Sequence, residues 1–238
     1  MLNYLFGGRF GDLIHGLVIP RYLYDTTGEK ANIYIANIGA EFTAGIETTY
    51  NELKPIMLQQ DFVASFEIYA TQKIDYHMYE FRNYPKLYTS CWTDVYFDRF
   101  LPGERPAKNY KWLKYDSAQN NSTIVSRAYL NSKTTDAYKY IIKQAKKTFF
   151  ISPDEKRWKD SELSDCTELL LVNTIEDIFS AINSCRIFLG DQSAHAAIAW
   201  ALGKPRIVEL NRLKSFYEYE SKYYDDFEWF HNGYLDIR

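Results

Sequence analysis

Residues 185–210 read CRIFLGDQSAHAAIAWALGKPRIVEL, and the order of residue types in this stretch decides the fold. Residues 186–189, of which the last three are apolar, predict a strand, and the small and polar residues 190–193 predict a loop. The alanine-rich segment 194–202 predicts a helix, which ends at a glycine, and 206–210 predict the next strand. Strand, loop, helix and strand in this order form a βαβ unit, the building block of a parallel sheet.

The N-terminus has the same pattern. Residues 2–6 predict a strand and 7–12, which read GGRFGD, predict a loop. Residues 13–24 carry apolar side chains at helical spacing, and 31–38 alternate as a strand does. Further strands are predicted at 62–69, 123–126, 148–152 and 168–172. Further helices are predicted at 47–57, 135–146 and 174–183, and Thr174 is expected to cap the last of them. Short helical pieces are predicted within 71–101.

A linker candidate divides the chain. Residues 102–121 gather Pro, Gly, Lys and Asn and lack a sustained apolar period. We therefore expect an α/β protein with two Rossmann-like halves, each built on a parallel sheet. The first half would span 1–105 and the second 122–212. The remaining tail, 213–238, is dense in Tyr, Phe, Asp and Glu and is expected to pack across both halves.

Composition and charge narrow the class of protein. The 238 residues carry 28 Lys plus Arg against 31 Asp plus Glu, a net charge of −3, which argues against nucleic acid as the main partner. Apolar runs are far shorter than the roughly 18–20 residues of a transmembrane helix, so no membrane span is expected. Three widely spaced cysteines and no secretory signal favour a soluble, cytoplasmic protein. The four histidines are scattered, so neither a metal nor a cofactor is expected.

The first candidate site is the loop 7–12. In an open parallel sheet, ligands bind beyond the carboxyl ends of the strands, where glycine loops meet helix N-termini that attract anions. Gly8 and Gly11 would give flexible backbone there, and Arg9 could hold an anionic group. Asp12 could act as a general base toward a substrate hydroxyl, or it could be an acid that merely favours the first turn of a helix. The spacing matches neither the GxGxxG dinucleotide fingerprint nor a Walker loop.

The second candidate site is the predicted loop before the helix 194–202. It consists of Gly190, Asp191, Gln192 and Ser193, whose N–H donors and hydroxyl suit a diphosphate. Structural capping by Ser193 or Asp191 is the alternative, and both roles can coexist. His195 follows this loop, and we interpret it as a structural residue.

A third candidate is Arg127, at the end of the predicted strand 123–126. A polar loop with Lys133 follows it, at the same edge of the sheet as the other two loops. Such convergence is what a binding cleft between two halves requires. A solvent-exposed loop is the alternative.

Two stretches resemble one known family. RFGDLIHGLVIPRYL, residues 9–23, is similar to the opening of the family 9 glycosyltransferases, heptosyltransferase-like enzymes with two Rossmann-like domains in the GT-B arrangement. Residues 185–210 are similar to that family's donor-site segment, in which a Ser-containing loop precedes a small-residue helix ending in ALGKP. The resemblance implies a compact GT-B-like fold, Asp12 as the base that activates the acceptor hydroxyl, and 190–193 as the contact for the donor diphosphate.

Other family positions match less closely. The resemblance places a further donor contact at Arg127. The family histidine after the serine is displaced by two positions here, so His195 does not inherit its role. The family's Lys-Arg-Trp motif follows the first strand of the second domain, whereas 156–158 follow the next strand, and we treat that match as coincidence. Lys133 is then the positional candidate for a phosphate contact.

The resemblance implies an inverting, metal-independent glycosyltransferase. It would move a sugar, a heptose or a hexose, from a nucleotide-diphosphate donor to a hydroxyl of a glycan or other acceptor. The alternative is a binding module for nucleotides or glycans that keeps the fold and has lost transfer, since the chain is shorter than most family members. A structural role for the Tyr-rich surface is a third hypothesis.

Overall fold

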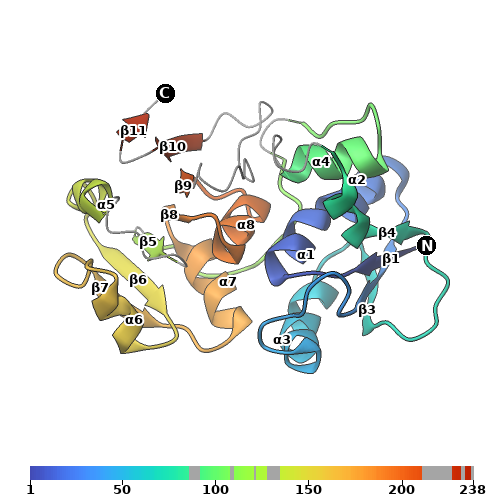
Figure 1. Cartoon of the computed structure of the whole chain (residues 1–238), viewed down its shortest axis with the longest axis horizontal. Coiled ribbons are helices and arrows are strands. Elements are labelled where there is room, and N and C mark those ends of the chain that lie inside the picture. Colours follow the sequence, from blue (N-terminus) through green and yellow to red (C-terminus); the bar gives the residue numbers. More distant parts are fainter. Residues whose placement is uncertain are drawn as a thin grey trace.

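Two sheets with helices on their faces make up the chain (Figure 1). The computed structural model describes residues 1–85, 92–107, 110–120, 122–127, 135–210, 227–231 and 234–236, the last two segments by their backbone alone. The predicted α/β class with two Rossmann-like halves is confirmed. None of the described helices combines the length and the apolar composition that crossing a lipid bilayer requires.

The first half is a four-stranded sheet in the order β3-β2-β1-β4, and every neighbouring pair is parallel. Its strands are β1 (Leu2–Phe6), β2 (Ala31–Ile35), β3 (Val63–Ile68) and β4 (Tyr76–His77). Its helices are α1 (Phe10–Gly16), α2 (Val18–Thr27), α3 (Ile46–Leu58), α4 (Trp92–Phe100) and the 3-10 helix η1 (Met78–Asn83). The strands predicted at 2–6, 31–38 and 62–69 and the helix at 47–57 are confirmed, with small shifts at their ends.

The helix predicted at 13–24 is instead two consecutive helices, α1 and α2, which meet at Leu17. Pro20 lies in the first turn of α2, where its missing N–H is tolerated but where it cannot bond back into α1. Gly16 closes α1 against two rings, since a Cβ there would lie 2.7 Å from Phe6 and 3.0 Å from Tyr96. The first helix also begins earlier than predicted, which places Asp12 in its first turn.

The second half is a seven-stranded sheet in the order β11-β10-β9-β8-β5-β6-β7. Its strands are β5 (Thr123–Ser126), β6 (Thr148–Ser152), β7 (Glu168–Leu171), β8 (Ile187–Asp191), β9 (Arg206–Leu210), β10 (Phe227–His231) and β11 (Tyr234–Asp236). Its helices are α5 (Thr135–Ile142), α6 (Glu155–Asp160), α7 (Ile175–Ser184) and α8 (Ala194–Ala201). All neighbouring strands are parallel except β10 and β11. The cap predicted for α7 is confirmed, because Thr174 Oγ1 accepts the N–H of Asp177 at 3.1 Å.

Three features of the second half differ from the predictions. Gly190 and Asp191 belong to β8 rather than to a loop, because β5 and β9 pair with that strand on both sides. The helix α6 is not predicted, although Asp154 caps it by accepting the N–H of Arg157 at 2.7 Å. The tail adds β10 and β11 beyond β9. Its side chains lie outside the described residues, so their packing across both halves stays a prediction.

The two halves are joined through α1 and α8, which pack against each other in the middle of the molecule (Figure 1). Small residues of α8, including Ala196 and Ala197, are fully buried in the hydrophobic cluster that spans both halves. Trp112, in the predicted linker, donates its Nε1–H to the Ile14 carbonyl at 2.8 Å and its backbone N–H to the Ala201 carbonyl at 3.1 Å. The linker therefore fixes α1 and α8 relative to each other.

Both halves reverse their strand order at the same place. After β1, β2 and β3 the chain returns to the other side of β1 with β4, and after β5, β6 and β7 it returns to the other side of β5 with β8. Ligands of parallel sheets bind at such switch points, beyond the carboxyl ends of the central strands. The loops after β1 and β8, which carry the two main candidate sites, lie at these points.

Candidate active site

Asp12 lies in the first turn of α1, and its side chain is almost completely buried, with 2% of the residue exposed. Its Oδ2 accepts the backbone N–H of Arg9 at 2.8 Å, which caps the start of the helix. The same oxygen accepts a hydrogen bond from Arg82 Nη2, which forms an ion pair with it. Oδ1 accepts no hydrogen bond from the described residues. Two donors thus hold Oδ2, and among the described residues Oδ1 remains available as a hydrogen-bond acceptor.

Gly8 and Arg9 shape the loop in front of this carboxylate. Gly8 has a φ of 88°, and a Cβ at this position would overlap Oδ2 of Asp12. Both the backbone conformation and the close approach require glycine here. The side chain of Arg9 is exposed and has no ion-pair partner among the described residues. It can therefore turn toward an anion.

Gly11 brings the two candidate loops together. A Cβ on Gly11 would lie 3.5 Å from Cα and 3.8 Å from the backbone nitrogen of Ala194, the first residue of α8. The first turns of α1 and α8 therefore touch. The predicted convergence of the two loops is present, with Asp12 on one side of this contact and Ser193 on the other.

The start of α8 is set by close approach of β8 to β5. A Cβ on Gly190 would lie 2.7 Å from the Ser126 carbonyl oxygen, so glycine lets the two strands pair at the switch point. Asp191 is buried, and Gln192 and Ser193 are half-buried. The Ser193 hydroxyl donates to the Asp191 carbonyl at 3.2 Å and does not cap α8. Backbone N–H groups at such a helix start attract anions.

His195 forms a hydrogen bond with Ser126, with 2.5 Å between Nδ1 and Oγ. Burial, and then the nearby positive charge of Arg157, lower the pKa of His195 to about 4. A serine next to a histidine suggests a nucleophile and its base, but an imidazole with such a low pKa is a weak base at neutral pH. The Ser126–His195 pair is therefore better suited to donating a hydrogen bond from the neutral imidazole at the switch point than to nucleophilic hydrolysis.

Arg127 and Arg157 lie close together beside this pair. Arg127 is 2% exposed, its guanidinium lies 4.6 Å from the centre of the Tyr138 ring, and Nη1 donates to the Ser161 carbonyl at 3.3 Å. Arg157 Nη2 donates to the Arg127 carbonyl at 3.0 Å. Arg127 is therefore packed into the second half, and Arg157 carries the less buried charge.

Two residues remain to be placed: Lys133, a predicted phosphate contact, and His15 of α1. Lys133 falls within 128–134, outside the described residues, and stays a prediction. His15 is fully buried, edge-on to the rings of Trp92 and Trp200. Within the described ranges, no three His, Cys, Asp or Glu side chains gather as a metal site would require.

Sequence reasoning missed Arg82 and Ser126, and it set Arg157 aside when the Lys-Arg-Trp match at 156–158 was treated as coincidence. Arg82 is 70 residues from Asp12, in a segment without a clear period, and no motif marks it. Ser126 could have been found from its place at the end of a predicted strand. Arg157 had a signal in Asp154, which is a typical helix cap and shows that the following residues lie at a strand end.

The fold of this chain is similar to that of solved heptosyltransferases and of a solved family 9 glycosyltransferase. Heptosyltransferase II of Escherichia coli, an ADP-heptose LPS heptosyltransferase, matches with a TM-score of 0.57 over 97% of this chain and 90% of its own, at 10% identity. The E. coli heptosyltransferase WaaC, solved with ADP, matches with a TM-score of 0.54 over 96% and 92%, at 8% identity. A family 9 glycosyltransferase from Veillonella parvula matches with a TM-score of 0.53 over 96% and 85%, at 9% identity.

The sequence by itself finds no such match. No protein-family model and no curated protein matches the chain. At identities of 8–10% the likeness is one of fold, so the chemistry has to be argued from this chain's own residues.

Proposed function

We propose that this chain is a glycosyltransferase that moves a sugar from a nucleotide-diphosphate donor to a hydroxyl of a glycan or other acceptor, with inversion and without a metal. The observation that carries this proposal is the contact between the first turns of α1 and α8. It puts a carboxylate with one uncommitted oxygen beside a helix start that suits a diphosphate. The shared fold with heptosyltransferases, one of them solved with ADP, supports a nucleotide sugar as donor.

In the proposed reaction, the acceptor hydroxyl oxygen attacks the anomeric carbon of the donor from the face opposite the diphosphate. Its proton passes to Oδ1 of Asp12 while the new C–O bond forms. The bond from the anomeric carbon to the diphosphate oxygen breaks, and its electron pair leaves on that oxygen. One displacement inverts the configuration and needs one base and no protein nucleophile.

The second half would stabilise the charge that develops on the diphosphate. The N–H groups at the start of α8 belong to this half, and the positive charge of Arg157 acts on His195, in the first turn of that helix. Neutral His195, held by Ser126, can add a hydrogen bond from its ring. Arg9 can approach from the first half, and Lys133 would be a further cation. Arg127 could contribute only if its packing on Tyr138 opened.

One observation favours a second candidate function. Asp12 is 2% exposed and paired, so the same fold could bind a nucleotide or glycan without transferring a sugar. A module of this kind would keep the α8 half of the site and make no use of Asp12.

A thermal-shift screen with ADP, UDP and GDP and their sugars tests the proposal. A ligand that binds only the folded state at 100 times its dissociation constant adds about 2.7 kcal/mol to the free energy of unfolding. We expect one nucleotide family to stabilise the protein and Arg157→Ala to reduce that shift. Lys156→Ala, which changes an exposed neighbour paired with Asp160, serves as the control.

The outcomes separate the candidates. Stabilisation by a nucleotide sugar together with sugar transfer to an acceptor panel supports the transferase. Stabilisation without transfer or donor hydrolysis supports the binding module. No stabilisation by any nucleotide contradicts the transferase and the nucleotide-binding module, and leaves only a module that binds a glycan.

A further inference from the structure

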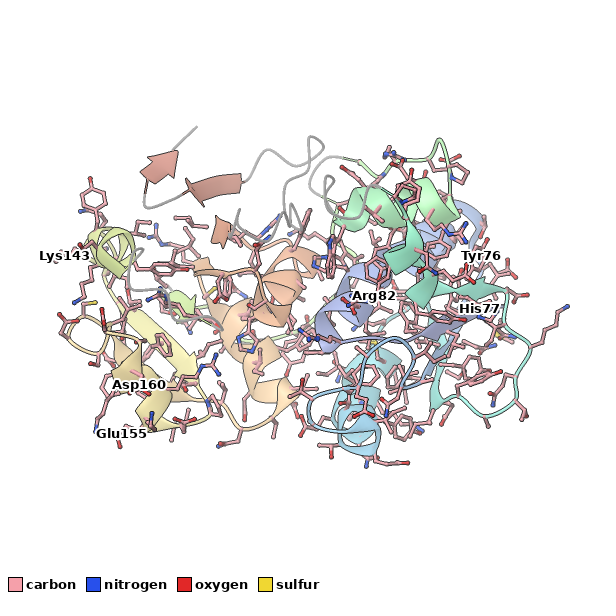
Figure 2. All side chains as sticks on the ribbon, in the orientation of Figure 1. Tyr76, His77, Arg82, Lys143, Glu155 and Asp160 are labelled. Carbon is pink, nitrogen blue, oxygen red and sulfur yellow. The ribbon has the colours of Figure 1, made fainter. Side chains whose placement is uncertain are left out.

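Arg82 reaches the candidate base from a different part of the chain. It lies in η1, directly after β4, and β4 pairs with β1 through Tyr4 with Tyr76 and Leu5 with His77. The segments after β1 and β4 therefore leave the sheet side by side at the switch point of the first half. Figure 2 shows Arg82 beside α1, near the middle of the molecule. From there its Nη2 donates to Oδ2 of Asp12.

Aromatic rings hold the guanidinium in place. Its carbon lies 5.3 Å from the ring centre of Phe81 and 5.9 Å from that of Trp92. Phe81 is fully buried and stacks on Tyr96 at 4.5 Å, and the Tyr96 hydroxyl donates to the Asp12 carbonyl at 2.9 Å. Asp12 and Arg82 are thus fixed to the same aromatic cluster, by the backbone of one and the side chain of the other.

The contact with Asp12 leaves one buried donor of Arg82 unpaired among the described residues. Its Nε–H is buried and has no partner among the described residues, although a buried donor left unpaired costs about 1–3 kcal/mol. An arginine that served the fold alone would be expected to satisfy this donor first. Such departures from full pairing are typical of functional positions.

All the contacts fall on one oxygen of the carboxylate. Arg82 and the Arg9 N–H both bond to Oδ2, and Gly8 lies so close to it that no side chain fits between. A carboxylate held through one oxygen cannot rotate, so the direction of the other oxygen is fixed as well. Removing the cation would leave a buried negative charge without its partner.

We propose that Arg82 is a positioning residue, which holds the Asp12 carboxylate oriented so that Oδ1 receives the proton of the acceptor hydroxyl. The proposal rests on the proposed transferase function. Arg82 itself touches neither the donor sugar nor the proton. The rival explanation is that the ion pair only ties η1 to α1.

The test compares Arg82→Gln, Arg82→Lys and Arg82→Ala with Arg99→Gln in a transfer assay. Arg99 pairs with Glu80, another residue of η1, on the protein surface, so its loss controls for a weakened η1. We expect kcat of R82Q to fall roughly 100-fold, as a misplaced catalytic group does, with KM for the donor nearly unchanged. R82K should keep part of kcat, and millimolar guanidinium should restore part of it in R82A.

Other results would overturn the proposal. Folded R82Q with wild-type kcat, or R82A that shows no response to guanidinium while its melting temperature and kcat fall together, would leave only the structural role. An inactive wild-type protein would instead refute the transferase function on which the proposal rests. An active wild type whose Asp12 and Arg82 variants show independent, multiplicative losses of kcat would refute the positioning role alone.

Discussion

The four strands β3-β2-β1-β4 of the first half and β7-β6-β5-β8 of the second follow the same order, yet the switch points of the two halves carry opposite chemistry. In the first half a buried carboxylate is anchored through one oxygen by Arg82 and a backbone N–H. In the second half a neutral imidazole, a serine and the charge of Arg157 surround the start of a helix. The first arrangement can take up a proton, and the second can stabilise a developing negative charge. The fold therefore repeats the switch point in both halves, and the side chains at each switch point determine its chemistry.

Apart from changes to Asp12 itself, the largest effect is expected from Gly8→Ala, which tests the carboxylate side. The added Cβ would push Oδ2 of Asp12 away from its two donors, so transfer should fall roughly 100-fold. Gly39→Ala is the matched control, because Gly39 also has a positive φ, 78°, but has open space around it. Initial-rate assays of both variants check this. Equal rates in G8A and G39A would show that the Asp12 position does not matter.

The second prediction concerns the pH dependence of the other switch point. Because the pKa of folded His195, about 4, lies below its usual 6.5, the unfolded state binds more protons between these values. Stability should therefore fall as the pH drops from 6.5 to 4, by on the order of 3 kcal/mol from this residue. Urea unfolding across this range should show a shallower dependence in His195→Gln. The same slope in both proteins would mean that folding does not lower the pKa of His195.

Gly190→Ala tests whether the second half binds the donor, because it should affect KM for the donor more than kcat. Its Cβ would lie 2.7 Å from the Ser126 carbonyl, which forces β5 and β8 apart and should lower the free energy of unfolding by about 1–3 kcal/mol. Since the start of α8 moves while Asp12 stays, we expect KM for the donor to rise more than kcat falls. Steady-state kinetics at several donor concentrations check this. A loss confined to kcat would contradict the assignment of the donor to this half.

The smallest effect is expected at a contact that joins the halves. Glu52 of α3 accepts the N–H of Ile175, at the start of α7, with 2.9 Å between Oε2 and nitrogen. Glu52→Ala should lower the free energy of unfolding by about 1 kcal/mol, whereas Glu41→Ala, an exposed loop residue, should change little. Chemical denaturation measures both. Two separate transitions in E52A would show that the halves are joined far more weakly than the shared cluster indicates.

The regular parts of the fold could be predicted because their signals are local. The first strand, the glycine loop and the cap at Thr174 follow from spacing, glycine and capping within a few residues. The short strand β4 and the strands β10 and β11 could not, since their pairing depends on distant partners and not on their own sequence. The same reason explains why Gly190 was predicted in a loop, because only β9 and β5 show that it lies in a strand.

The candidate site divides in the same way. Asp12 could be selected from the sequence because a glycine loop before a helix marks a strand end. Arg82 could not, because the ion pair forms between segments that the sheet order alone brings together. Arg127 was selected correctly as a strand-end residue, but the sequence does not show that Tyr138 and Ser161 surround its side chain.

The role of Asp12 as the base is tested most directly by measuring donor binding and sugar transfer together in Asp12→Asn. The amide can still accept the Arg9 N–H, so the loop should keep its shape while the base is lost. Asp160→Asn, at the outer edge of the second half in Figure 2, is the control. If Asp12 is the base, D12N should bind the donor with an affinity within about twofold of wild type and transfer the sugar about 10²- to 10⁴-fold more slowly. Full transfer in D12N, or affinity lost in parallel with transfer, would contradict it.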